Sequence, residues 1–157
     1  MEEAMVEMLP YLKYPNVHLA FDPEWHTSRP MREIGSVTAA EVNTAQRLMR
    51  DYMIKNNIRG KRQLVFHQFH AKMLRNKEQV KADYDPVILV HATSGWGPPG
   101  NKMSTHERNS LTRNIPSKGF KLWFFYSSQK GVHFDKPLMT PEEVLALRPE
   151  PEIIIYQ

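Results

Sequence analysis

Apolar residues follow two different spacings along the chain, and the two spacings alternate. Short runs rich in Val, Ile, Leu and Phe, which are typical of buried strands, occupy positions 17–22, 63–69, 86–92, 119–126 and 152–156. Amphipathic segments or helix start signals occupy positions 2–12, 38–57, 70–81, 102–113 and 144–147. This order predicts helices and strands in strict alternation.

Two capping boxes mark helix starts. Thr38 is followed by Glu41, and Thr140 is followed by Glu143 with proline at the first helical position. In this motif the threonine hydroxyl and the glutamate carboxylate accept hydrogen bonds from backbone N–H groups that a first helical turn leaves free. The sequence therefore predicts a long helix after the first box and a short one after the second.

The predicted strands carry apolar residues on both faces, which is typical of parallel strands. We expect an α/β fold in which parallel βα units form a partial (β/α)8 barrel of the TIM type, as a single domain over residues 1–157. A complete barrel takes about 250 residues, so about five strands predict an incomplete barrel with two free edges. The last strand, Ile153-Ile154-Ile155, has no helix after it to cover its edge. We therefore expect a homodimer through the sheet edges.

Composition excludes several classes of function. The 21 basic and 17 acidic residues give a net charge of +4, but the basic residues are scattered, which favours a solvated surface over a nucleic-acid interface. The absence of cysteine excludes disulfides, thiolate zinc sites and cysteine nucleophiles. No apolar run approaches the roughly 18 residues that cross a bilayer, and the acidic start is unlike a signal peptide. We expect a soluble chain that contacts no membrane, in a compartment that composition leaves open.

Polar side chains gather where the predicted strands end. In parallel α/β folds, ligands bind beyond the carboxyl ends of the strands. The candidate residues at these ends are Asp22, Glu24, Trp25, His26, His67, Gln68, His91, Tyr126 and Tyr156. The amino ends carry no comparable cluster, so the sequence predicts one site at one rim of the sheet.

Asp22 and Glu24 lie two positions apart, which places both carboxylates on one face of an extended chain. A protonated carboxyl beside an ionised one is the pair that glycosidases use. We expect Glu24 to be the general acid/base and Asp22 its partner, acting on a carbohydrate substrate. In the structural alternative, Asp22 ends the strand through turn hydrogen bonds and Glu24 is solvated.

Two histidines and a lysine extend the predicted site. Alternation puts His67 and His91 on strand faces that we expect to line the barrel interior, near the carboxylates. With Asp22 they would form a ligand set for a divalent ion, but no spacing such as HExxH is present and we expect no metal. Lys121 lies in an apolar strand, where it either pairs with a carboxylate or extends its stem to solvent.

Aromatic side chains near the rim suit a sugar ring, because their faces stack on flat apolar surfaces. Trp96, in the Gly/Pro-rich loop 94–100, is the preferred ligand platform, with Trp25, Tyr126 and Tyr156 as further candidates, whereas Trp123 is assigned to the core. GxGxxG, Walker and GxSxG motifs are all missing from the sequence. We therefore expect no cofactor and no serine-hydrolase mechanism.

Five segments carry a wider likeness, namely VHLAFDPEWH, IGSVTAAEVN, LVFHQFH, GFKLWFFY and LMTPEEVLALRPEPEIIIYQ. They resemble an uncharacterised family of bacterial, often exported, (β/α)-barrel proteins, in which the same segments read like ALDPEW, IGSVDAAEVN, LHQF, GFKLFYDED and TPAEVLAL. The resemblance runs from about Val17 to Gln157, matches the later part of such barrels and implies a glycoside-hydrolase-like fold. Asp22 and Glu24 also resemble, more loosely, the Asp-x-Glu strand end of lysozyme-like glycosidases.

The chain departs from that family at two acidic segments. Residues 127–129 are Ser-Ser-Gln where the family has Asp-Glu-Asp, and residues 93–97 replace an Asp-Gly-Phe-Gly segment. Three functions therefore stay open. The leading one is a glycan-directed hydrolase, the second is a non-catalytic glycan-binding or assembly module derived from such a barrel, and the third is a metal-dependent hydrolase using Asp22, His67 and His91.

Overall fold

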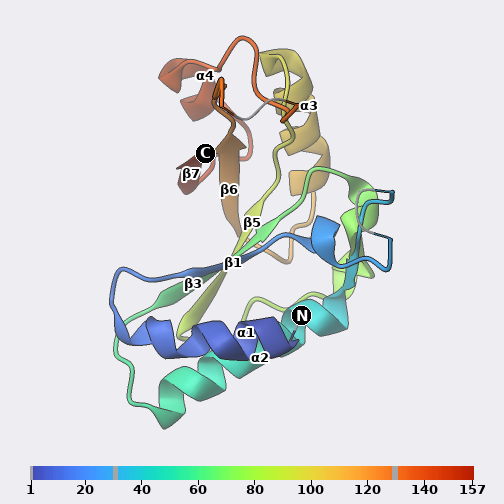
Figure 1. Cartoon of the computed structure of the whole chain (residues 1–157). Helices are drawn as coiled ribbons and strands as arrows, with labels where there is room; N and C mark the ends of the chain where they lie inside the picture. The colour runs from blue at the N-terminus through green and yellow to red at the C-terminus, as the bar shows by residue number, and fades with distance from the viewer. Residues whose placement is uncertain (1, 30–31, 129–130) are drawn as a thin grey trace.

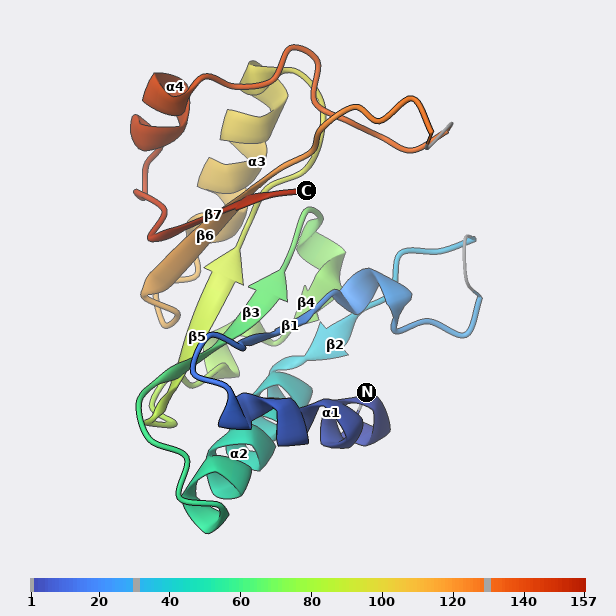
Figure 2. The ribbon, with the colours of Figure 1, turned by 60° about the vertical axis from the view of Figure 1, so that its left-hand side comes forward.

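The computed structural model describes residues 2–29, 32–128 and 131–157, and its centre is a sheet of five parallel strands (Figure 1). The strands lie side by side in chain order as β1 (Leu19–Phe21), β3 (Arg62–His67), β5 (Val87–Ala92), β6 (Ser117–Leu122) and β7 (Ile153–Tyr156). The sheet curls into a half-barrel (Figure 2). An α/β fold with about five parallel strands is therefore confirmed. A second, two-stranded sheet pairs β2 (Val37–Thr38) with β4 (Leu74–Arg75).

Four α-helices are described, and two of them begin at the predicted capping boxes. They are α1 (Glu2–Met8), which continues as the 3-10 helix η1 (Leu9–Lys13), α2 (Ala39–Lys55), α3 (Pro99–Ser110) and α4 (Pro141–Leu145). Both capping boxes are confirmed, at Thr38 with Glu41 and at Thr140 with Glu143. None of the helices in the described ranges is long and apolar enough to cross a membrane.

The prediction of a helix at 70–81 is wrong. That stretch forms two 3-10 turns, η3 (Ala71–Met73) and η4 (Lys77–Gln79), on either side of β4. Asn76 has a left-handed backbone with φ of 55°, which interrupts any helix there. Side chains from other elements also take the backbone groups of this stretch, because Asn43 binds Gln79 O and Gln46 binds Lys81 O. Tertiary contacts thus outweigh a weak helical pattern.

Two other boundaries differ from the prediction. The fourth predicted strand, 119–126, begins earlier as β6 and ends at Leu122, because the backbone N–H of Trp123 donates to the Asp135 carboxylate. The helix predicted at 102–113 spans Pro99–Ser110 as α3, so it begins within the loop 94–100 that the sequence predicts to be irregular. Proline is tolerated there because the first helical turn lacks an acceptor for its N–H in any case.

The register of the strands decides which residues share a face. Leu19, Leu64 and Leu89 lie in one row, and Phe21, Phe66 and His91 lie two rows further on. These rows form the outer face, which packs against α1, η1 and α2 in the main core. The inner face carries a smaller cluster of Val65, Val90 and Ala92 with half-buried isoleucines from β5 and β7, namely Ile88, Ile153 and Ile155. The core therefore lies on the helix side, and the concave side is only partly covered.

Candidate functional site

The carboxylates of the site are placed by a tight turn after β1. Asp22 ends the strand, and the 3-10 turn η2 (Pro23–Trp25) carries Glu24. Gly35 N donates to Glu24 O at 3.0 Å. A Cβ at Gly35 would lie only 2.4 to 2.7 Å from three backbone oxygens of this turn and the residue after it. Glycine is thus required where the loop returns against the turn.

Asp22 forms a dyad with His67, which lies at the end of β3. The Oδ1 of Asp22 lies 2.6 Å from Nδ1 of His67, and Nε2 of His67 lies 2.9 Å from the backbone oxygen of Ser94. Each ring nitrogen therefore faces an acceptor oxygen. His67 is 4% exposed, and these two contacts fix its ring between Asp22 and Ser94.

Lys121 approaches the same carboxylate from β6. Its Nζ lies 3.9 Å from Oδ2 of Asp22 and 4.3 Å from the centre of the Trp123 ring, which gives the ammonium a carboxylate and an aromatic face as partners. Ser94 holds the lysine backbone, since its Oγ donates to Lys121 O and accepts from Lys121 N. Side chains from β3 and β6 thus meet Asp22 at the end of β1.

The surroundings move the pKa values of the two carboxyls in opposite directions. Burial raises the pKa of Asp22, but the hydrogen bond and charge of His67, together with Lys121, outweigh burial and hold this pKa below its ordinary value. Burial, followed by the nearby charge of Asp22, raises the pKa of Glu24 above its ordinary value. Glu24 therefore retains a proton to higher pH than Asp22 does.

A buried ion pair holds the backbone behind this site. Lys102 and Asp135 have fully buried side chains, and their Nζ and Oδ2 atoms are 3.1 Å apart. Lys102 also donates to the backbone oxygens of Gly95 and Lys121, while Asp135 accepts from the backbone N–H groups of Gly97 and Trp123. Burial lowers the pKa of Lys102 to about 8 even though Asp135 opposes the shift. The pair ties three segments together directly beside Lys121.

His91 does not share the site, and its predicted placement is wrong. The register pairs His91 with Phe66, so His91 lies on the outer face, while His67 pairs with Ala92 on the inner face. His91 is fully buried, and its Nε2 bonds Oε1 of Gln68, another predicted site residue, at 2.7 Å. The ligand set of Asp22, His67 and His91 is therefore not assembled. Within the described ranges, no three His, Asp or Glu side chains are grouped to hold a metal ion.

The predicted aromatic platforms are dispersed. Trp96 stacks on His133 with ring centres 3.8 Å apart, and Tyr126 and Tyr156 pack against Phe124 at the β6–β7 side of the sheet, opposite β1. Trp25 and His26 remain beside Asp22, because all three line the same cavity. Trp25 is 63% exposed, and the His26 ring bonds the backbone oxygen of Ser36.

Trp123 was assigned to the core, and that assignment is wrong. It is half-buried, carries Lys121 on its face and lies 6.1 Å from the His67 ring. Residues 127–128, where the sequence differs from the family that it resembles, are exposed, and Gln129 lies outside the described residues.

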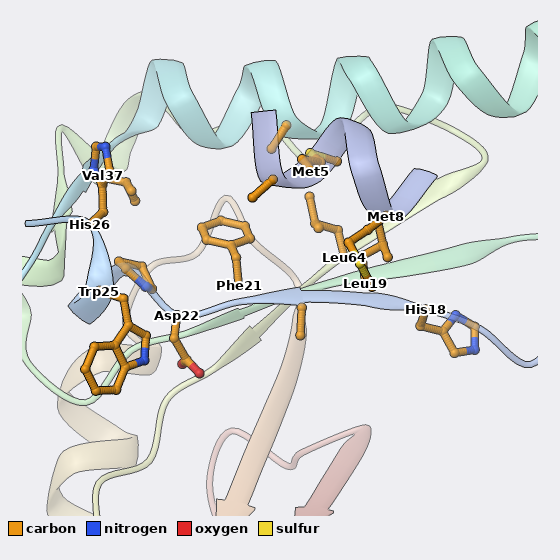
Figure 3. Close-up of a pocket in the computed structure, with 14 residues that line it drawn as sticks. Met5, Met8, His18, Leu19, Phe21, Asp22, Trp25, His26, Val37 and Leu64 are labelled. Atoms are coloured by element: carbon orange, nitrogen blue, oxygen red, sulfur yellow. The ribbon is translucent and has the colours of Figure 1, made fainter. Parts of the chain in front are cut away.

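A cavity of about 430 Å³ lies along β1 (Figure 3). Its apolar wall comes from α1, β1 and β3, including Met5, Met8, Leu19, Phe21 and Leu64. Figure 3 shows these side chains on one side of β1, with Asp22 and Trp25 at the carboxyl end of the strand and His18 at the other end. Asp22, Trp25 and His26 also line the cavity, so it reaches the carboxylate site at the end of β1.

Sequence reasoning missed three residues that build the site. Ser94 follows β5 and continues the inner-face alternation of Val90 and Ala92, so this signal was readable in the sequence. Lys102 and Asp135 are 33 positions apart and carry no local signal for their pairing.

Comparison with protein-family models, with curated proteins and with solved structures gives no match.

Proposed function

We propose that the chain is a glycan-directed hydrolase of the glycosidase type, with Glu24 as general acid/base and Asp22 as its ionised partner. The observation that supports this proposal is that the surroundings hold the pKa of Asp22 below its ordinary value and raise the pKa of Glu24, two residues later, above its ordinary value. A pair of carboxyls with separated pKa values is the arrangement in which one group gives a proton while its neighbour stays negative.

In the proposed reaction, the protonated Glu24 gives its proton to the glycosidic oxygen as the bond to the sugar carbon breaks. The positive charge that develops on the sugar ring is then stabilised by the Asp22 carboxylate. A water molecule adds to the sugar carbon and gives up a proton, which restores the acid. His67 and Lys121 keep Asp22 ionised and hold its orientation.

Trp25 is the aromatic platform that this proposal uses, since it follows Glu24 directly and is 63% exposed. We further propose TIM-type winding for the half-barrel. Its strands follow chain order and its main core lies on the helix side, whereas doubly wound sheets reverse their strand order.

A second candidate is a non-catalytic glycan-binding module. It is favoured by the engagement of both Asp22 oxygens, since Oδ1 bonds His67 and Oδ2 faces Lys121. A carboxylate held in this way is well placed to accept sugar hydroxyls.

One experiment separates the two functions. Purified protein is incubated with peptidoglycan, chitooligosaccharides and soluble β-glucans, and new reducing ends and bound glycan are both measured. For a hydrolase, Glu24→Gln lowers the rate by about 10²-fold or more and leaves the melting temperature within about 2 °C, while exposed Glu78→Gln serves as the matched control. Binding without cleavage by the wild type favours the module, and an unchanged rate in Glu24→Gln contradicts the acid/base assignment.

A further inference from the structure

Both edges of the sheet are unpaired among the described residues. β1 begins the strand order and β7 ends it, and every neighbouring pair between them is parallel. The two outer strands therefore offer free backbone donors and acceptors along edges that run in the same direction. A free edge of this kind pairs readily with another strand.

A cavity lies along the β1 edge. The cavity of about 430 Å³ lies along this strand beneath α1, and its apolar wall is formed by side chains of the outer face and the helix, among them Met5, Met8 and Phe21 (Figure 3). On the inner face of the same strand, Ala20 is exposed. The outer face beside β1 therefore has a cavity under α1, and the inner face is open at Ala20.

The β7 edge supplies side chains that match both faces. Ile154 shares the outer face with Phe120, while Ile153 and Ile155 lie in the rows of Gly119 and Lys121 on the inner face. All three isoleucines are only half-buried, and Tyr156 is 49% exposed on the outer face. Strands of parallel sheets are usually buried on both faces, and β7 has apolar side chains on both.

We propose that two copies of this chain pair the β1 edge of each with the β7 edge of the other, closing two half-barrels into one ring. A two-fold axis along the barrel keeps all the strands parallel, and it makes the two seams identical. Pleat alternation then allows only registers that keep inner-face residues beside inner-face residues. Ile154 and Tyr156 of the second copy face the cavity under α1, and Ile153 and Ile155 join the inner face beside Ala20 and Val65.

This pairing also completes the site. The carboxyl ends of parallel strands lie at the same rim, so the second copy brings its Tyr156 and Gln157 beside Asp22 and Trp25. The carboxylate site then has a second wall, which the single chain leaves open at β1. The dimer is tested by its mass and by cross-links, so the outcome does not depend on whether the proposed hydrolysis is correct.

Cysteine cross-linking tests the pairing directly, because the chain contains no cysteine of its own. Neighbouring strands lie about 4.8 Å apart, within the range that a disulfide bridges. Ala20→Cys protein mixed with Ile155→Cys or Ile153→Cys protein is expected to form a covalent dimer on oxidation, and each variant alone is not. Ile54→Cys, on an exposed position of α2, is the matched control and is expected to give none with Ala20→Cys.

Light scattering of the wild type is expected to give twice the 18.4 kDa chain mass. Ile155→Lys is expected to shift the protein to the monomer, whereas Ile54→Lys leaves the mass unchanged. A wild-type monomer at about 100 µM, or efficient cross-linking of Ala20→Cys protein to itself, overturns the proposed pairing. The cross-linking result decides the matter if Ile155→Lys fails to fold.

Discussion

The buried pair of Lys102 and Asp135 offers a sharp test of how the structure is held together. Both side chains are fully buried, and each also bonds two backbone groups from segments beside the site. Lys102→Met leaves a carboxylate with only two N–H partners. Asp135→Asn leaves an ammonium with neutral acceptors only, namely two backbone carbonyls and at most the one amide oxygen of the asparagine. Each single substitution creates an unpaired buried charge while keeping the side-chain volume nearly the same.

The cost of each substitution has an upper limit, because the orphaned group can instead become neutral. At pH 7, removing the proton from a lysine of ordinary pKa about 10.4 costs about 5 kcal/mol, and protonating an aspartate of ordinary pKa about 3.9 costs about 4 kcal/mol. Breaking buried pairs generally costs about 3–5 kcal/mol. We therefore expect each single variant to lose about 3–5 kcal/mol of the free energy of unfolding. The double variant Lys102→Met/Asp135→Asn is expected to lose far less than the sum, since no charge is left unpaired.

Urea unfolding followed by tryptophan fluorescence and circular dichroism measures these losses. The matched control is Lys61→Met, which breaks an exposed pair with Asp85 of similar length, 3.3 Å, and is expected to change stability by less than about 1 kcal/mol. The two single variants also differ in pH dependence. The loss in Asp135→Asn shrinks as pH rises to about 8, the pKa of Lys102 in the folded wild type, because below that pH the folded variant has released a proton that the folded wild type still holds. The loss in Lys102→Met shrinks as pH falls, because the folded state holds the proton of the aspartate.

Two outcomes would refute this reasoning. Single losses below about 1 kcal/mol mean that water reaches the pair and that the burial of both side chains is not maintained in solution. A double variant that loses the full sum of the single losses means that the two groups do not interact.

Two further predictions concern the carboxylate turn. Lys121→Met removes a positive charge that lowers the pKa values of Asp22 and Glu24. Both limbs of the pH–rate profile are therefore expected to move to higher pH. A profile that does not move contradicts this role of Lys121. Gly35→Ala places a methyl group against backbone oxygens of the turn, starting with Pro23 O, and is expected to lower the melting temperature and the activity together. Gly100→Ala, where an added Cβ meets nothing within 4 Å, is the control for Gly35, and equal melting temperatures for both variants would contradict the close approach.

Local signals in the sequence determined the helix starts, the approximate strand positions and the rim that carries Asp22. Capping boxes act over three residues, and apolar runs report burial without knowledge of the partner strand. Thr38 with Glu41 and Thr140 with Glu143 are therefore found where the sequence predicts them. Parallel strands also share one direction, so strand ends that are polar in the sequence meet at one rim.

Which face each residue takes, and which distant groups meet, was decided only by the tertiary structure. Alternation relates residues within one strand, but the register between β3 and β5 pairs His67 with Ala92 and sends His91 to the outer face. The helix expected at 70–81 failed because side chains of α2 take its backbone groups. Lys102 and Asp135 are 33 positions apart in the sequence. Their ion pair is strong only in the folded chain, where both groups are removed from water, so no local pattern predicts it.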